Sequence, residues 1–373
     1  MATSGKCRYI SLILIFLGIF NCLVKGQVLK DQEAFKKIKE GVENIYDWKF
    51  DDAKKDYWFV KSRYPGSPVP YLFKGMMIYW EYFPLIPGTA ESRMFIDNMV
   101  KCLDLSEEFQ KKNGDDAENL LAGLGSLGMM LLYYADNGQT SKVIGLAAPT
   151  YQYVMKAFDY TNVYSDFYFI TGLYNYYREA YPEERPIYRP VVVFFPHGNK
   201  KLGLKELKIA ADSAIFLQAE SFSFLSGIYL TFERNPASAV EYSRKLVARH
   251  PNNLEFQTDY IRDLLLAKKY STAQKILDSI PYPVYNKYLQ ARVDIFKGIL
   301  FEKKNRKDRI AESYYWSGIN KAENYKTFAD DYRSYAYFGL SRISERKGDK
   351  KNMKKYRKLA ENLAPYEYIN FDD

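Results

Sequence analysis

The chain has 373 residues, of which 47% are hydrophobic and 17% aromatic, and its formal net charge is +9. This hydrophobic content excludes a disordered chain. The length suffices for two or three domains or for one repeat array. Two of the three cysteines, Cys7 and Cys22, precede Gln27, where we expect the mature chain to begin. A disulfide framework and a cysteine zinc site within one mature chain are therefore also excluded.

Residues 1–26 have the order of a secretory signal peptide. Lys6 and Arg8 form its positive beginning, residues 9–20 are apolar, and cleavage is expected ahead of Gln27. The apolar run is shorter than the ~20 residues of a membrane-spanning helix, although an uncleaved anchor is the alternative. We therefore expect an exported, periplasmic protein, which would be membrane-associated if the signal stayed in place.

A pair of helices is expected directly after the signal. Apolar residues recur at helical spacing over Lys30–Tyr46, and a second helix is predicted over Asp52–Tyr64. Gly41 and Ala53 carry little or no side chain, so the two backbones can approach closely there. Pro65 ends the pair, because proline lacks the N–H group and clashes with the preceding turn.

Residues 69–180 are expected to form further helix pairs, with helices over 69–82, 91–111, 115–134, 141–158 and 166–180. Within this region Gly123, Gly125 and Gly128 match the spacing of a dinucleotide-binding loop. That fingerprint needs a preceding strand and an acidic residue ~20 positions later. A helical pattern precedes the glycines and no such acid follows, so we predict a helix that packs closely on its neighbour at these glycines.

The stretch 181–199 interrupts the helical pattern with four prolines and the apolar run 191–195. Long loops inside compact folds are often functional. We therefore place the candidate binding residues in and before this loop, with interhelical core as the alternative for the tyrosines and a surface loop for the histidine. The candidates are Tyr174, Tyr177, Arg178, Tyr181, Arg185, Arg189 and His197.

Helix pairs are expected again beyond Asn199, which is placed as an N-cap. The segment Glu220–Pro251 has the spacing of the first pair, with Gly227 and Ala239 in the helices and Pro251 at the end. His250 is expected to be favoured at its helix terminus by the helix dipole.

These two segments resemble the tetratricopeptide repeat, a helix-turn-helix unit of ~34 residues. Gly41, Ala53, Tyr57 and Pro65 match its small, aromatic and proline positions, and Gly227, Ala239 and Pro251 match three of them. Later units are marked by Ala273, by Gly298 with Ala311, and by Gly339, Ala360 and Pro365. The resemblance covers residues 31–64 and 220–365. It implies an all-α solenoid of helical hairpins in a right-handed superhelix, with repeats over 27–180 and 200–373.

The expected function is a non-enzymatic protein-binding or scaffold module of the bacterial cell envelope, because stacked hairpins leave a concave surface for a protein or peptide. The partner is unidentified, and no cofactor, metal or nucleic acid is expected. Repeats that bind a C-terminal carboxylate use Lys and Asn at positions held here by Ile38, Val42, Phe224 and Ile228, so that binding mode is disfavoured. The alternatives are glycan capture, outer-membrane assembly, and a hydrolase using Glu179, Glu183 or Glu184.

Overall fold

The computed structural model describes residues 27–186, 189, 193, 195–366 and 368–372. Within these residues all regular structure is α-helix or 3₁₀-helix, so the predicted all-α class is confirmed. The predicted signal, residues 1–26, and most of the apolar run 191–195 lie outside the described residues. No helix in the described part combines the length and the apolar character that crossing a bilayer requires.

The helices follow one another along the described chain, and most of them are separated by short turns. The first half contains η1 Val28–Lys30, α2 Gln32–Tyr46, α3 Phe50–Arg63, α4 Val69–Glu81, α5 Ala90–Asn113, α6 Ala117–Asp136, α7 Thr140–Ala157, η2 Phe158–Tyr160 and α8 Phe167–Glu184. The second half contains α10 Lys200–Ser213, α11 Gln218–Thr231, α12 Pro236–Arg249, α13 Leu254–Leu266, α14 Tyr270–Ser279, α15 Lys287–Lys303, α16 Asp308–Ala322, η4 Glu323–Ala329, α17 Asp330–Arg346 and α18 Lys350–Leu363.

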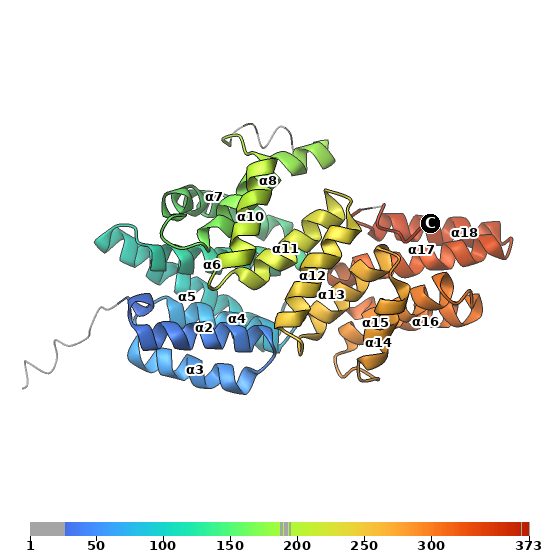
Figure 1. Ribbon diagram of the computed structural model, residues 1–373, viewed down its shortest axis with the longest axis horizontal. Helices are drawn as coiled ribbons and strands as arrows, with labels where there is room; N and C mark the ends of the chain where they lie inside the picture. The colour runs from blue at the N-terminus through green and yellow to red at the C-terminus, as the bar shows by residue number, and fades with distance from the viewer. Residues whose placement is uncertain (1–26, 187–188, 190–192, 194, 367, 373) are drawn as a thin grey trace, which may run out of the picture.

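Consecutive helices pack in pairs, as Figure 1 shows for α2 with α3 and for α17 with α18. Successive pairs also touch through their first helices, α2 with α4, α4 with α6, α13 with α15 and α15 with α17. This order of contacts is consistent with a helical repeat. It places the first helices of several pairs next to one another.

Short polar side chains determine where several helices begin. The Asp31 carboxylate accepts hydrogen bonds from the backbone N–H groups of Glu33 and Ala34 at the start of α2, at 3.0 and 3.2 Å. Asn199 accepts the N–H of Leu202 at 3.0 Å, which confirms the predicted N-cap of α10. Such caps satisfy donors that the first turn of a helix leaves without an intrahelical partner.

The glycine positions of the repeat frame have different surroundings. A Cβ atom at Gly41 would lie 2.1 Å from Cζ of Phe73, so Gly41 is closely packed, but against a side chain of α4 and not against the backbone of α3. A Cβ atom at Gly227 would meet nothing within 4 Å, so the predicted close approach at Gly227 is wrong. The neighbouring Ser226 is buried instead, and its hydroxyl donates to Asp263 on α13 at 2.5 Å.

The glycines of α6 follow the prediction at two positions of three. A Cβ atom at Gly123 would lie 2.3 Å from Tyr153, and one at Gly125 would lie 2.9 Å from Leu72, whereas Gly128 faces open space. All three lie inside α6, so the segment is a helix that packs closely on its neighbours.

The two halves of the chain meet through hydrogen bonds between residues about two hundred positions apart. The Asn253 side chain donates to the Tyr46 carbonyl at 2.8 Å, and the Asn286 side chain donates to the Phe83 carbonyl at 2.6 Å. The hydroxyl of Thr327 donates to the carbonyl of Asp136 at 3.2 Å. The ends of α2, α4 and α6 are thereby joined to the beginnings of α13 and α15 and to η4.

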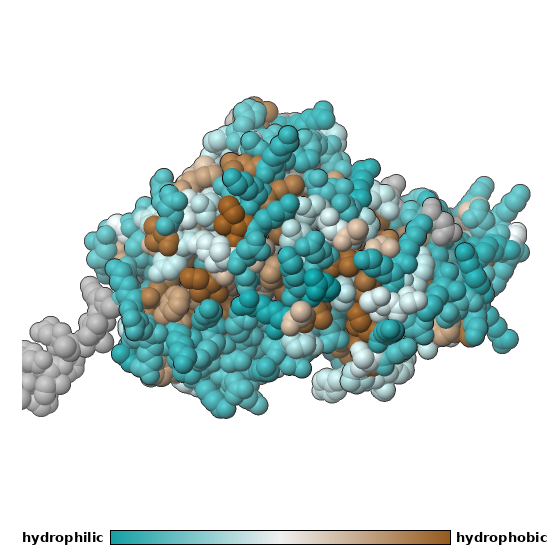
Figure 2. Space-filling view, viewed as in Figure 1, coloured by the Kyte–Doolittle hydropathy of each residue, from teal (hydrophilic) through white to brown (hydrophobic). Residues whose placement is uncertain are grey.

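The surface of the molecule is mostly hydrophilic on the face drawn in Figure 2. Apolar side chains gather in the middle of this face and to its left, over the regions where α10 to α15 and α5 and α6 lie in Figure 1. The interior holds two clusters of buried apolar side chains, one centred on α2, α3, α8 and α10 and the other running from α5 and α6 to α17.

Candidate functional site: an acidic, aromatic-lined cavity

A cavity of about 430 Å³ lies where the two halves of the chain meet. Its walls come from α2, α4, α6, α11, α13, α15, η4 and α17, so the first helix of most helix pairs contributes to it. Its volume is within the range of small-molecule and side-chain pockets. We refer to it below as the central cavity.

Aromatic rings form a continuous wall of the central cavity. The ring centroids of Tyr46 and Trp80 lie 5.7 Å apart, and Trp80 stacks on Phe83 at 5.6 Å. Phe83 continues the series to Tyr288 at 5.9 Å, and Tyr288 meets Phe328 at 5.2 Å. These separations are those of favourable aromatic pairs, so packing within the wall holds the rings in place.

Carboxylates form the other feature of the lining. Five of them border the central cavity: Asp136 from α6, Glu220 from α11, Glu255 and Asp259 from α13, and Asp331 from α17. Among the described residues, no lysine, arginine or histidine lines it. A cavity with one sign of charge and low-dielectric walls concentrates the electrostatic field that attracts oppositely charged ligands.

Burial keeps two of these carboxyl groups partly protonated at neutral pH. Burial raises the pKa of Glu220 to about 8, and the nearby Glu43 adds repulsion. Within the described chain, the Oε2 atom of Glu220 is shielded from solvent and has no hydrogen-bond partner. Burial also raises the pKa of Asp136 to about 7, although Asp136 accepts a hydrogen bond from the Tyr79 hydroxyl at 3.3 Å.

The remaining three carboxyl groups respond to two nearby arginines. Burial raises the pKa of Glu255, because desolvation and the neighbouring Asp259 outweigh the attraction of Arg292. Burial also raises the pKa of Asp331 to about 6, against the attraction of Arg262, although Asp331 keeps contact with solvent in the cavity. Asp259 differs: burial opposes its ionisation, but the two arginines together lower its pKa.

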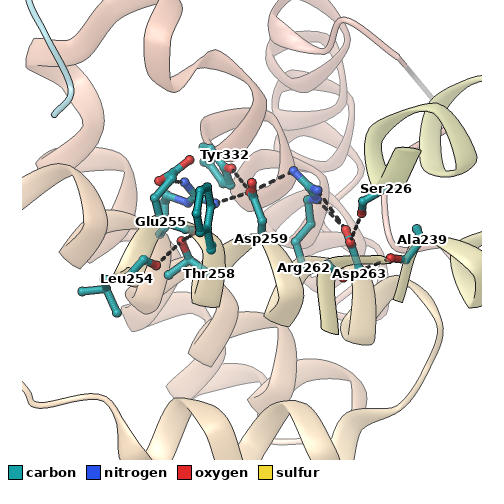
Figure 3. Close-up of polar contacts among 12 residues, drawn as sticks. Ser226, Ala239, Leu254, Glu255, Thr258, Asp259, Arg262, Asp263 and Tyr332 are labelled. Carbon is teal, nitrogen blue, oxygen red and sulfur yellow. Dashed lines mark hydrogen bonds and ion pairs between the residues drawn. The ribbon is translucent and has the colours of Figure 1, made fainter. Parts of the chain in front are cut away.

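A chain of ion pairs lies behind the acidic wall (Figure 3). Arg292 of α15 is fully buried and pairs with both Glu255 and Asp259, the second pair at 2.5 Å. Arg262 of α13 pairs with Asp259 at 3.1 Å and with Asp263 at 2.9 Å. Both arginines therefore face carboxylates, and Arg292 additionally lies over the Tyr332 ring at 4.3 Å from its centroid.

The α13 carboxylates leave a signal in the sequence that sequence reasoning missed. Glu255, Asp259 and Asp263 recur every four residues, which places three like charges on one face of a helix. Such pairs destabilise an isolated helix, so their presence on a buried face requires cationic partners. Arg262 stands three residues after Asp259 on the same helix, but Arg292 comes from another helix pair and could not be identified from spacing.

The residues predicted as a binding site lie outside the central cavity. Tyr174 donates to the Pro196 carbonyl at 2.7 Å, and Arg178 donates to the Phe195 carbonyl at 3.0 Å. The two side chains hold the segment after α8 against that helix. His197 is 90% exposed, with Nδ1 3.7 Å from a Glu179 carboxylate oxygen.

Tyr177 and Tyr181, also predicted as binding residues, lie in the last two turns of α8. The rings of Tyr177 and Tyr181 lie 5.4 and 5.5 Å from Phe232, in interhelical contact. The predicted loop 181–199 is wrong over its first four residues, because α8 continues to Glu184. The packing of these two rings against Phe232 outweighs the tendency of Pro182 to interrupt the helix.

The two remaining arginines of the predicted site bind backbone carbonyls. Arg185 donates to the Pro365 carbonyl at 2.6 Å and lies over the Tyr366 ring at 5.3 Å from its centroid. Arg189 donates to the Pro182 carbonyl at 3.3 Å. Arg185 therefore joins the end of α8 to the C-terminal segment.

The carboxylates considered for hydrolysis have partners of their own. Glu183 pairs with Lys200 at 2.8 Å, Glu184 pairs with Arg234 at 3.3 Å, and Glu179 accepts the backbone N–H of Gly198 at 2.9 Å. None of the three borders the central cavity.

The expectation that the helix dipole favours His250 at its helix terminus is wrong. It is 1% exposed, its ring lies 5.6 Å from Tyr46 and 5.9 Å from Phe256, and neither ring nitrogen has a hydrogen-bond partner in the described chain. Burial lowers its pKa to about 4, so it is neutral at physiological pH. A charged histidine favoured by the helix dipole is therefore excluded, because the cost of burial exceeds the dipole effect.

Metal-binding chemistry has no support within the described residues, where no cluster of three or more His, Cys, Asp or Glu residues has a suitable arrangement. Comparison with known proteins adds no family, because no family model matches the chain and no curated protein matches it significantly.

Proposed function

We propose that the protein is a non-enzymatic binding module of the bacterial cell envelope, in which the central cavity receives part of a protein or peptide partner. The proposed architecture is a tetratricopeptide-like solenoid of helical hairpins in a right-handed superhelix. The succession of helix pairs and the match of Gly41, Ala53 and Pro65 to the repeat frame support it. The envelope location is inferred from the signal-like order of residues 1–26.

The central cavity is the observation that carries the proposal. In a solenoid of hairpins, equivalent helices of successive units line one shared surface. The cavity is bordered by the first helices of most pairs, which fits that surface. Its aromatic lining resembles the composition of energetically important interface positions, where large rings bury area at low cost in conformational entropy.

Position-specific cross-linking tests this proposal in cells that express the protein. A photoreactive amino acid would replace Leu132, which borders the central cavity and is 39% exposed, or Ile144 of α7, which is 69% exposed and lies outside it. We expect a discrete protein adduct in the envelope fraction from position 132 and none from position 144. Absence of an adduct at 132, or equal adducts at both positions, would contradict the proposal.

Glycan capture is a second candidate, favoured by the combination of rings and carboxylates in the central cavity. Rings stack on sugar faces, and carboxylates accept hydrogen bonds from hydroxyl groups. Trp80 borders the cavity, so oligosaccharide binding should change the tryptophan fluorescence in a Trp80-dependent way. A flat titration over a broad panel of oligosaccharides would remove this candidate.

A further inference from the structure

We infer that the central cavity binds an organic cation, an ammonium or guanidinium group. A lysine or arginine side chain of the partner would supply it, or a small polyamine with the same chemistry. The inference rests on the proposal that the cavity is the binding site and specifies which chemistry it selects.

The charge of the lining is the first reason. Five carboxyl groups and no cationic side chain border the central cavity in the described part of the chain. The buried arginines behind it pair with Glu255 and Asp259. Asp136, Glu220 and Asp331 form no ion pair with any described residue. A cation entering the cavity would meet three carboxyl groups that form no ion pair within the described chain.

The position of Glu220 is the second reason. Glu220 lines the central cavity, and its Oε2 atom is shielded from solvent and accepts no hydrogen bond within the described chain. A buried acceptor without a donor costs free energy, and native proteins leave few such groups unsatisfied. An ammonium or guanidinium N–H would satisfy it and would stabilise the ionised form of the carboxyl group.

The aromatic wall gives the third reason and narrows the kind of cation. Tyr46, Trp80 and Phe83 present rings beside the carboxylates, and ring faces attract desolvated organic cations. A metal ion would instead need several oxygen or nitrogen ligands around one point, and no such cluster exists among the described residues. A volume of about 430 Å³ also exceeds what a single inorganic ion would fill.

Calorimetric titration of the purified protein tests the inference directly. The cationic probes are Nα-acetyl-lysine amide, Nα-acetyl-arginine amide and spermidine, and Nα-acetyl-norleucine amide is the neutral match for the lysine probe. We expect at least one cation to bind about tenfold or more tightly than the neutral match, as a hydrogen bond to a charged group implies. Equal binding of the neutral probe, or no binding of any cation, would overturn the inference.

Charge-neutralising variants locate the binding within the cavity. Glu220→Gln and Asp331→Asn keep side-chain shape and should each weaken binding of the cationic probe about tenfold, while the neutral probe is unaffected. Glu183→Gln on α8 lies outside the cavity and serves as the matched control, with unchanged affinity. Circular dichroism confirms folding, and if one cavity variant fails to fold, the other provides the test. Unchanged affinity in the folded cavity variants would refute the assignment.

The outcomes separate this inference from the proposed function. Tight binding of the amino acid amides points to a partner side chain, whereas preference for spermidine points to a free polyamine, and both support a cation site. A cross-linked adduct at position 132 without cation binding would leave the binding module in place and refute the cation. Cation binding without an adduct at position 132 would support the cation site and refute the binding module.

Discussion

Replacing Gly41 by alanine should lower stability relative to the same replacement at Gly227. The new Cβ atom at position 41 would lie 2.1 Å from Cζ and 2.9 Å from Cε1 of Phe73, whose side chain is only 2% exposed. The ring cannot turn toward solvent, so neighbouring groups must shift. At position 227 the new atom would meet nothing within 4 Å.

The magnitude follows from two opposing contributions. Overpacking a core costs ~1–3 kcal/mol. Alanine inside a helix is favoured over glycine by ~0.8–1.0 kcal/mol. Gly41→Ala should therefore lose up to about 2 kcal/mol, and Gly227→Ala should gain about 1 kcal/mol. Both glycines lie within helices, so the propensity contributions cancel in the comparison and leave a difference of ~1–3 kcal/mol for packing alone.

Urea unfolding followed by far-ultraviolet circular dichroism measures this difference, provided that the slope with denaturant is unchanged. Shortening the neighbouring ring should restore space, so Phe73→Leu combined with Gly41→Ala should cost less than the sum of the single changes. The reasoning is refuted if Gly41→Ala is as stable as Gly227→Ala, or if the double variant is merely additive.

Two further predictions concern Arg292, which lies behind the acidic wall of the central cavity, and Glu220, which lines the cavity. Arg292→Met should cost ~3–5 kcal/mol in urea unfolding, because it leaves Glu255 and Asp259 buried without their shared cation. Arg249→Met removes a partly exposed ion pair and should cost ~0–1 kcal/mol, so equal losses would contradict the burial argument. The pKa of Glu220 is raised from 4.5 to about 8 in the folded state, so its contribution to stability is complete below the lower value and is lost as pH rises to the upper one. Glu220→Gln should therefore become more stable relative to the parent as pH rises through this window, and a pH-independent difference would disprove the raised pKa.

The repeat frame predicted the helix pairs well and the packing at individual glycines only in part. Periodicity and caps are local properties, so α2 lies close to its expected range, and α11 and α12 form the helix pair expected over 220–251. Whether a glycine is a contact point depends on the neighbouring helix. Ser226, beside Gly227, makes the hydrogen bond to α13.

The central cavity could not be predicted from the sequence, because its lining also depends on which helices become neighbours. The candidate residues in and before 181–199 stand out in the sequence because of the density of aromatic residues and the prolines there. In the structure these side chains bind backbone carbonyls or pack against Phe232 and Tyr366.

The sequence by itself determined an all-α chain of successive helix pairs, because helical periodicity, N-caps and prolines act over a few residues. Only the tertiary structure decided where the central cavity lies and what lines it. Its walls join residues about two hundred positions apart, such as Phe83 with Tyr288, whose rings lie 5.9 Å apart. The spacing of carboxylates on α13 shows a charged face, but only the packing of other helix pairs decides that Arg292 lies behind it and that Glu220 has no partner in the described chain.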